Sequence, residues 1–368
     1  MTICSRCILD SRIPNITFDS KGFCNYCRLH DKWERDHSYR VWKPILKDIK
    51  NSGRNKRYDC VVGISGGCDS SYLLYNTKEV FGLRPLAVHW DNNWNTNIAK
   101  ENIRKMIDGL GVDFCRIGVD RKEYDDICRS FLLASVVDAD IPNDIALTTV
   151  LYYIAEKFGV KYIFNGHNFR TEGTTPLGWS YMDGKYVESV QKTFGTCKLK
   201  TFPNLWLEDW LVWLNDGIKR IRPLWYVHYK KEDAKRLLNE KFGWEWYGGH
   251  HLENKYTIFV SNFLQPLKFR IDLRLIEFSA LIRSGQMDRD YALQMLEEPP
   301  RIDEEIIEEV KKRLQISDDE LDQILKDPIK THNDYETYQK TFKKYRNRFQ
   351  KAVEENLIPK TFFEKYMR

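Results

Sequence analysis

The sequence lacks any long apolar run, and this absence bears first on where the protein works. No stretch approaches the roughly 18–20 consecutive apolar residues that a membrane-spanning helix needs. The first residues, MTICSRCILD, contain no apolar signal-peptide core. We therefore expect a soluble, cytoplasmic protein without a membrane partner. Internal repeats and low-complexity tracts are also missing, which argues against a repeat architecture.

A strong excess of one charge is missing as well. Lys and Arg total 58 against 53 acidic residues, so the net charge is +5 over 368 residues. A nucleic-acid-binding protein is expected to concentrate basic residues on one face, so this balance permits an anionic ligand but does not favour nucleic acid. There are nine cysteines. Without a secretory signal their thiols should be reduced, and a cluster of them would indicate metal binding or catalysis.

Four cysteines do cluster, in two C-x2-C pairs: Cys4 with Cys7, and Cys24 with Cys27. Each pair can place two thiolates on one edge of a tetrahedron, and the residues between the pairs suit a hairpin whose turn has Gly22 available for a positive φ. Four thiolates select zinc over hard cations and leave no open coordination position. The pattern predicts a structural zinc knuckle in residues 1–35. An iron–sulfur cluster or redox-active pairs are the alternatives.

Residues 60–72 read CVVGISGGCDSSY, in which an apolar run ends in two glycines and a series of polar side chains. The apolar residues predict a buried parallel strand, and residues 68–82 predict a helix. Glycine allows the connecting turn to approach a ligand closely, and the amides at the start of the helix form an anion site. The expected phosphate-binding residues are Ser65, Gly66, Gly67, Ser70 and Ser71. Asp69 could hold Mg²⁺ or brace the loop.

The flanking sequence predicts further strands of the same sheet. A second strand ends near His89 and Asp91, a third spans 112–119, and a fourth spans 161–168 with Gly166-His167 at its tip. A helix is expected over 147–160. Polar residues at strand ends are typical of nucleotide sites in doubly wound sheets. We predict an α/β protein with a doubly wound parallel sheet in residues 55–250, followed by a helical C-terminal region in 251–368.

The S-G-G-x-D-S-S run resembles the PP-loop of the N-type ATP pyrophosphatases. Gly166-His167 and Arg222-Pro223-Leu224 are similar to two further motifs of that superfamily. The resemblance implies an adenine nucleotide alpha-hydrolase-like fold that binds ATP and Mg²⁺ and cleaves between the α and β phosphates. It implies that His89, Asp91, Gly166 and His167 contact ATP, and that Arg222 faces its phosphates.

The knuckle, combined with the blocks GHN…TEG, 179–190, 247–253 and 268–289, resembles the N-acetyl sugar amidotransferase family over most of residues 1–300. One departure is Leu252, which separates His251 from Glu253 where the family often has a His-His-Glu-Ser run. The resemblance implies conversion of a sugar acetamido group to an acetamidino group through an adenylylated intermediate. Glu172, His251 and Lys268 are then candidates for handling the sugar, which could be nucleotide-linked, or the ammonia.

The source of ammonia can also be addressed from the sequence. Cys197 and His251-x-Glu253 look like parts of a glutaminase, but the Cys197 segment lacks the second glycine of a nucleophile elbow. We therefore expect a separate glutaminase subunit, with a channel-forming partner as the resemblance implies. His250, His251 and Glu253 could instead bind a metal. Side chains so close in sequence rarely converge on one ion without a ligand from elsewhere, so hydrogen bonding to substrate is the other interpretation.

The rival function is a tRNA-modifying enzyme of the thiolase type. Such enzymes generally need paired cysteines in the ATP domain, and the five remaining cysteines contain no C-x-x-C: Cys60, Cys68, Cys115, Cys128 and Cys197. A non-enzymatic scaffold would be expected to have lost the polar residues of the loop, which are intact. The tryptophan-rich segment 204–220 has helical spacing and is predicted to be buried in the core.

Overall fold

The computed structural model describes residues 2–355, 357–358 and 360–367. Its centre is a five-stranded sheet in the order β3-β2-β1-β4-β5, with every neighbouring pair parallel. The strands are β1 (Cys60–Gly63), β2 (Pro85–Asp91), β3 (Asp113–Gly118), β4 (Tyr162–Phe164) and β5 (Lys219–Ile221). The order reverses between β1 and β4, which confirms the doubly wound parallel sheet. Strand β5 was not predicted, because its sequence Lys-Arg-Ile has no apolar run.

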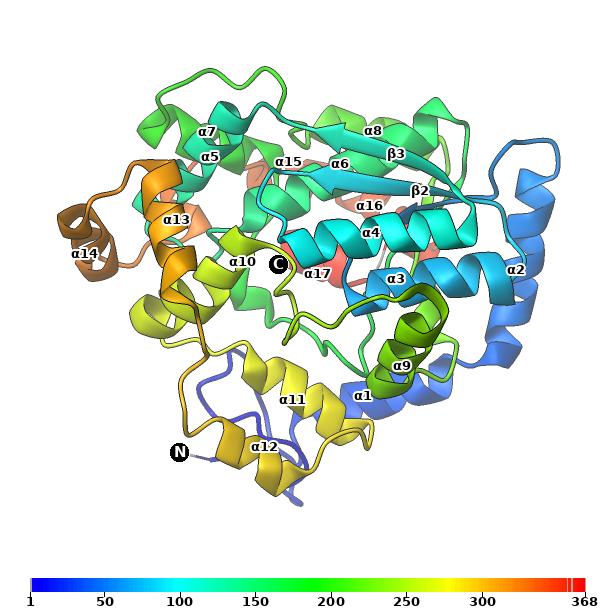
Figure 1. Ribbon diagram of the computed structural model, residues 1–368, viewed down its shortest axis with the longest axis horizontal. Helices are drawn as coiled ribbons and strands as arrows, with labels where there is room; N and C mark the ends of the chain where they lie inside the picture. Colours follow the sequence, from blue (N-terminus) through cyan, green and yellow to red (C-terminus); the bar gives the residue numbers. More distant parts are fainter. Residues whose placement is uncertain (1, 356, 359, 368) are drawn as a thin grey trace.

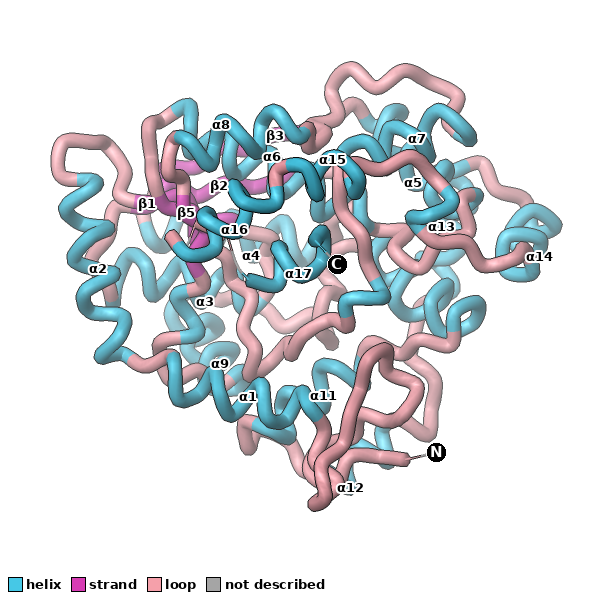
Figure 2. The backbone as a smooth tube through the Cα atoms, turned by 180° about the vertical axis from the view of Figure 1, so that it is seen from behind, coloured by secondary structure: helices cyan, strands magenta, loops and turns pink. Residues whose placement is uncertain are grey.

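Helices enclose the strands on both sides, as Figure 2 shows with the strands in magenta. The helices before residue 250 are α1 (Asn25–Asp36), α2 (Tyr39–Gly53), α3 (Cys68–Tyr75), α4 (Asn97–Leu110), α5 (Arg121–Leu133), α6 (Ile141–Lys157), α7 (Gly184–Phe194), α8 (Leu207–Asn215) and α9 (Lys231–Phe242). The later ones are α10 (Lys255–Phe259), α11 (Arg274–Arg283), α12 (Arg289–Met295), α13 (Glu304–Leu314), α14 (Asp318–Lys326), α15 (Gln339–Lys344), α16 (Arg346–Glu354) and α17 (Lys360–Met367). Among the described residues, none of these helices has both the length and the apolar character needed to cross a bilayer.

Short 3₁₀ and π-helical segments complete the chain. The π-helical segments are η1 (Asn76–Val80) and η4 (Val260–Phe269), and the 3₁₀ turns are η2 (Leu177–Trp179), η3 (Pro223–Trp225) and η5 (His332–Asp334). The helix predicted over 68–82 is α3 continued by η1, and it ends near Gly82 with φ of +60°. The helix predicted over 147–160 begins earlier than expected, at Ile141, because Pro142 fits the first turn of a helix.

The two faces of the sheet bury two different cores. Val61 of β1 points into a core that contains residues of α5, α6, α7 and α8, whereas Cys60 and Val62 point into a core shared with α2, α3, α4 and α9. This alternation follows from the two-residue period of a strand. A sheet covered on both faces leaves only its strand ends open to a ligand.

The C-terminal helices share the first of these cores. Val310, Phe342 and Phe349 are buried in it together with the residues of α5 and α6. Tyr345, where α15 and α16 meet, is 38% exposed and lies outside this core. The core thus continues across residue 250, and the domain boundaries stay predictions.

The N-terminal knuckle packs on α11 and α12, and the three lie at one end of the molecule (Figure 1). Phe18 and Cys24 form an antiparallel bridge, and Gly22 in the turn has φ of +77°. The expected hairpin is therefore confirmed. In the tryptophan-rich segment, Trp210 and Trp213 of α8 are buried as predicted, whereas Trp206, just before the helix, is exposed.

Candidate functional site

The glycine turn after β1 has a backbone that requires glycine. Gly66 has φ of +86°, and a Cβ atom there would lie 3.0 Å from the Cα atom of Ala99. The carbonyl of Gly66 accepts hydrogen bonds from Trp244 Nε1 at 3.0 Å and Asn102 Nδ2 at 3.3 Å. The turn is therefore fixed from two sides, with its amides at the start of α3.

The serine hydroxyls of the turn lie close together. Ser65 Oγ is 3.2 Å from Ser70 Oγ and accepts a hydrogen bond from the amide of Gly67 at 3.2 Å. Ser71 differs, because its side chain is fully buried and its hydroxyl has no hydrogen-bond partner among the described residues. Of the predicted phosphate ligands, Ser65 and Ser70 are the accessible hydroxyls, and Ser71 is the least accessible.

Asp69 joins the turn to the loop after β4. Its Oδ1 atom accepts hydrogen bonds from Tyr229 Oη at 2.6 Å and from Thr171 Oγ1 at 3.3 Å. A Cβ atom on Gly166 would lie 3.2 Å from the amide nitrogen of Ser70, so the tip of β4 rests against the start of α3. Asp69 braces the loop in this way. Its Oδ2 atom makes no hydrogen bond to another described residue and is the one that could hold Mg²⁺.

Two arginines at the end of β5 form a cationic region beside the turn. Burial, followed by the charge of Arg220, lowers the pKa of Arg222 to about 10. Neither guanidinium forms an ion pair with a carboxylate in the described part of the chain, and Arg222 lies over the ring of Trp225 at 4.9 Å. Burial, then the charges of Arg222 and Arg220, hold the pKa of His167 well below its ordinary value. A bound phosphate would offset this positive charge.

Glu172, His250 and His251 form a third feature, which we call the His-Glu cluster. One ligand atom from each of them lies within 4.8 Å of the others. The imidazole rings are 3.6 Å apart between centroids, and His250 Nε2 is 4.0 Å from Glu172 Oε2. Burial and the neighbouring carboxylate of Asp69 raise the pKa of Glu172 well above its ordinary value. Burial likewise lowers the pKa of His250.

Glu253 is not a member of this cluster, although it follows His251 closely in sequence. Its Oε1 atom accepts a hydrogen bond from Ser65 Oγ at 3.1 Å. Its Oε2 atom is buried and has no hydrogen-bond partner among the described residues. The third ligand atom near the two histidines comes instead from Glu172, on the loop after β4.

Lys268 is the predicted site residue that the structure does not bring to this cluster. Its ammonium group donates hydrogen bonds to the carbonyl oxygens of Ile324 and, at 2.8 Å, Asp327. These carbonyls lie at the C-terminal end of α14, where a helix leaves acceptors unpaired and favours a cation. Lys268 therefore caps a helix, and its role in handling substrate stays a prediction that these contacts do not support.

His89 and Asp91 lie at the end of β2, as predicted, but their polar atoms are already engaged. The carbonyl of Ile64 is 2.8 Å from His89 Nδ1. The Asp91 carboxylate accepts hydrogen bonds from Arg116 Nε at 2.7 Å and from the amide of Asn93 at 2.9 Å. Both residues hold this edge of the sheet in place, and contact with ATP stays a prediction for them.

The four cysteines of the knuckle have the spacing that zinc requires. Their sulfur atoms are 3.6–3.7 Å apart in the Cys4–Cys27, Cys7–Cys24 and Cys24–Cys27 pairs. A tetrahedral ion with Zn–S bonds of about 2.3 Å places sulfurs about 3.8 Å apart. Arg283 Nη1 lies 3.6 Å from Cys7 Sγ, and Arg289 donates to the carbonyls of Cys4 and Cys7. The donor set fits a zinc ion held closed by four thiolates.

A bidentate ion pair connects the knuckle side to the loop after β4. Arg170 donates to both carboxylate oxygens of Glu34, on α1, at 2.6 and 2.7 Å. The same guanidinium donates to the carbonyl of Trp225 at 3.2 Å. Because Arg170 precedes Thr171 and Glu172, α1 helps to fix the loop that carries them.

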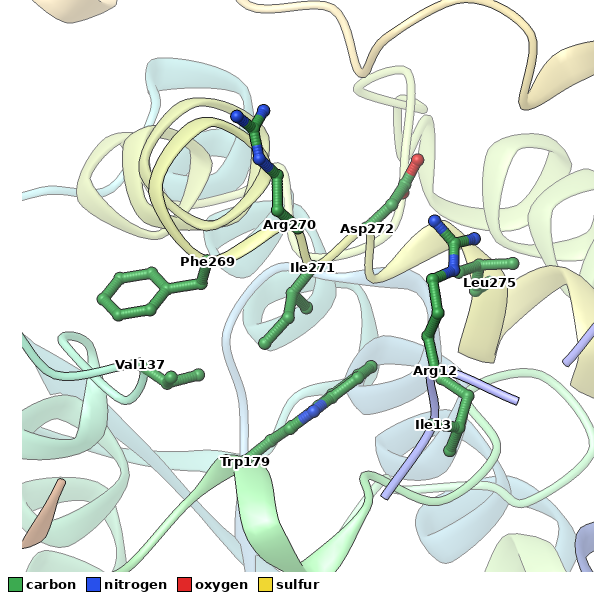
Figure 3. A pocket seen from close by; sticks show the side chains of 9 residues that line it. All are labelled: Arg12, Ile13, Val137, Trp179, Phe269, Arg270, Ile271, Asp272 and Leu275. Carbon is green, nitrogen blue, oxygen red and sulfur yellow. The ribbon is translucent and has the colours of Figure 1, made fainter. Parts of the chain in front are cut away.

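A cavity of about 330 Å³ lies between the knuckle and the start of α11. Its lining residues are Arg12, Ile13, Val137, Trp179, Phe269, Arg270, Ile271, Asp272 and Leu275. Figure 3 shows the Trp179 ring facing Ile271, with the side chains of Arg12 and Arg270 nearby. Arg12 is paired with Asp10, and Asp272 also lines the cavity, so its lining carries both signs of charge and specifies no class of ligand.

Sequence reasoning missed several residues of this region. Two of them are tyrosines that contact the turn. Tyr229 Oη donates a hydrogen bond to Asp69, and Tyr247 Oη accepts one from the amide of Cys68 at 3.3 Å. Lys231 pairs with Glu277 at 2.9 Å, and Arg220 lies beside Arg222. Tyr247 stands in the 247–253 block, which was a usable signal. The others are placed by contacts between distant segments and had no local signal.

Comparison with known proteins gives one family match. Residues 253–350 match the model of the LPS biosynthesis protein WbpG-like, C-terminal domain. The uncharacterized protein MJ1599 of Methanocaldococcus jannaschii is 24% identical over 314 residues, which cover 84% of this chain and 98% of that protein.

Two solved structures show a distant likeness. NMN synthetase from Francisella tularensis has a TM-score of 0.33 at 14% identity and covers 79% of this chain and 95% of its own. The U34-tRNA thiolase NcsA from Methanococcus maripaludis, solved with its 4Fe-4S cluster, has a TM-score of 0.30 at 14% identity and covers 81% and 89%. Similarity at this level assigns no function.

Proposed function

We propose that this chain is an ATP-dependent, AMP-forming amidotransferase that converts a sugar acetamido group to an acetamidino group in surface-polysaccharide biosynthesis. The hydrogen bond between Ser65 and Glu253 carries the proposal. It joins the glycine turn, with its anion-binding amides, to the first residue of the region that matches the WbpG-like family. The proposed phosphate site is thus in contact with the segment that matches the LPS biosynthesis family.

The reaction is suited to this arrangement of residues. The amide oxygen of the substrate attacks the α-phosphorus of ATP, and pyrophosphate leaves; ammonia then adds to the activated carbon, and AMP leaves with the oxygen. The protein has to align the oxygen with phosphorus and to stabilise charge on the phosphates. The amides of the turn and the hydroxyls of Ser65 and Ser70 would hold the phosphates, and Arg222 would stabilise their charge. The cavity lined by Trp179 is a candidate for the rest of the substrate.

Ammonia is proposed to come from a separate glutaminase subunit, with a channel-forming partner. Cys197 is the one residue placed like a glutaminase nucleophile, and burial together with the Asp126 carboxylate raises its pKa to about 11. A thiol with so high a pKa is a poor nucleophile at neutral pH. Glu253, from the matching His-x-Glu pair, contacts Ser65 instead.

The cysteines also argue against the thiolase alternative. Among the described residues, the cysteines that group with metal-binding spacing are the four of the knuckle. Cys60 and Cys128 are fully buried, and burial raises the pKa of each thiol well above its ordinary value. Neither has the exposed, low-pKa character that sulfur transfer needs.

The experiment is a screen of free and nucleotide-linked N-acetylated sugars with ATP and ammonium. We expect sugar-dependent release of AMP and pyrophosphate, and a product in which mass spectrometry shows NH in place of the carbonyl oxygen. Glutamine should not replace ammonium for the isolated chain. Formation of ADP and orthophosphate would exclude the proposal, and AMP formation with tRNA but with no sugar would favour the thiolase alternative.

A further inference from the structure

We propose that the His-Glu cluster of Glu172, His250 and His251 is a second metal site, which binds a divalent transition cation such as Zn²⁺ or Co²⁺. It is separate from the knuckle and from any Mg²⁺ that accompanies the nucleotide. The inference rests on the placement of the three side chains and holds whichever substrate the chain uses.

The first observation is convergence from distant segments. Glu172 follows β4, whereas His250 and His251 lie in the loop before α10, yet the three ligand atoms are within 4.8 Å of one another. Ligands at about 2.0–2.2 Å from a tetrahedral ion lie about 3.3–3.6 Å apart. Small side-chain rotations therefore suffice to bring these atoms onto one ion.

The second observation is that the imidazoles lack other partners. None of their ring nitrogens makes a hydrogen bond of 3.5 Å or less to another described residue, although the side chain of His250 is only 15% exposed. The carboxylate of Glu172 makes one hydrogen bond, at 3.2 Å, from the amide of Asn168 to Oε1. Its Oε2 atom points to His250. A metal ion would satisfy all three groups at once.

The third observation is that the histidine loop is held in a defined shape. Gly248 has φ of +99°, and His251 has φ of +59°, which is uncommon for a residue other than glycine. After the histidines, the carbonyl of Glu253 accepts from the amide of Thr96 at 2.9 Å. The side chain of Asn254 donates to Asn92 at 3.0 Å. The two rings are thus placed side by side by the backbone.

The chemistry of the donors selects the kind of cation. Two imidazoles and one carboxylate favour zinc, cobalt or iron, whereas magnesium prefers oxygen ligands alone. Three protein ligands also leave a position open, unlike the four thiolates of the knuckle. The positive charges of Lys231 and Arg222 act on Glu172. The fourth coordination position of the metal would therefore be expected to take a neutral or anionic ligand.

The test uses full-length protein with zinc already in the knuckle. Co²⁺ is added by equilibrium dialysis without nucleotide, and zinc and cobalt are both counted by elemental analysis. We expect one Co²⁺ per chain with zinc retained, and an absorption spectrum without thiolate-to-cobalt charge transfer. His250→Gln, His251→Gln and Glu172→Gln should each weaken Co²⁺ binding at least about tenfold, because each removes one of three ligands.

His228→Gln is the matched control, because His228 is exposed and should leave binding unchanged. A melting temperature close to that of the wild type shows that each variant has folded, and the wild-type stoichiometry decides the question even if a variant does not fold. The proposal fails if the wild type binds no Co²⁺, if the bound Co²⁺ carries thiolate absorption, if millimolar Mg²⁺ displaces it, or if the three variants bind like the wild type.

Discussion

The knuckle and the His-Glu cluster both bring metal-ligating side chains together, but the chain builds them in different ways. The four cysteines lie within the first 27 residues, and a hairpin turn with Gly22 is enough to assemble them. Glu172 and the two histidines come from loops on separate parts of the chain and meet only when the sheet and the C-terminal region have packed. The four cysteines are fully buried, whereas the second cluster is partly exposed and lies close enough to Asp69 of the glycine turn to feel its charge. The spacing of residues in the sequence is enough to predict the cysteine cluster. The His-Glu cluster can be recognised only from the three-dimensional structure.

The largest expected effect is the loss of stability when one cysteine of the knuckle is replaced. Cys27→Ser removes one of four thiolates, and we expect loss of zinc and of most of the folding energy that it contributes, which is about 10 kcal/mol in small zinc modules. Residues 1–35 should then become sensitive to protease, and the melting temperature should fall. Cys197→Ser, at an exposed cysteine, is the control. A Cys27→Ser protein with full zinc content and an unchanged melting temperature would contradict the structural role.

The next effect concerns catalysis, which should depend on residues near the His-Glu cluster. Arg222→Met should lower kcat by about 10²–10³-fold, because it removes a cation aimed at developing phosphate charge. The melting temperature should change little or rise, since the buried Arg222 has no ion-pair partner among the described residues. Arg40→Met, at an exposed arginine of α2, is the matched control. Equal kcat in the two variants would remove Arg222 from the mechanism.

The knuckle and the buried carboxyl group of Asp140, which precedes α6, should respond to pH in opposite directions. Burial raises the pKa of Asp140 from 3.8 to about 8, so between these values the native state holds a proton that the unfolded state has released. Stability from this group is therefore fully present at low pH and falls as pH rises toward 8, by an amount on the order of a few kcal/mol. The knuckle behaves oppositely, because acid protonates the thiolates and releases zinc.

Urea unfolding of the zinc-loaded protein at several pH values above that of zinc release measures this slope. Asp140→Asn should flatten it, since the amide does not titrate, while Thr257 can still donate to the side chain at position 140. Asp290→Asn, at a side chain that is 94% exposed, should keep the wild-type slope. An Asp140→Asn protein whose stability declines as steeply as that of the wild type would show that another group is responsible.

The smallest effect tests the connection between the two regions. Glu34→Gln weakens the bidentate pair with Arg170, and we expect a loss of about 1–2 kcal/mol in unfolding free energy. Turnover should also fall several-fold, because Arg170 precedes the loop that contacts Asp69. Asp31→Asn makes the same change on the same helix but breaks a pair with Arg6, within the knuckle. Asp31→Asn should lower stability while leaving turnover unchanged. An equal loss of turnover in both variants would mean that turnover depends on the stability of the knuckle and not on the Glu34–Arg170 pair.

The sequence predicted those features that depend on neighbouring residues. The buried parallel strand β1, the hairpin turn with a positive φ at Gly22, and the cysteine grouping all follow from local rules, and the structure confirms them. Strand β5 escaped prediction because three residues, two of them charged, give no periodic signal. The contact of Lys268 with the end of α14, more than fifty residues later, was not predicted, because no local pattern reveals such a contact. The convergence of Glu172 with His250 was hidden for the same reason.

The hydrogen bond from Ser65 to Glu253 also affects how a nucleotide would arrive. The Glu253 carboxylate occupies one of the proposed phosphate donors, the Ser65 hydroxyl, through Oε1, and its Oε2 atom is buried. Under the proposed function, binding of ATP would therefore require the Glu253 carboxylate to move away from the Ser65 hydroxyl. Glu253 lies two residues before α10, so a movement of its carboxylate would be transmitted to the start of that helix. The conformation of this segment would then depend on whether nucleotide is bound at the turn.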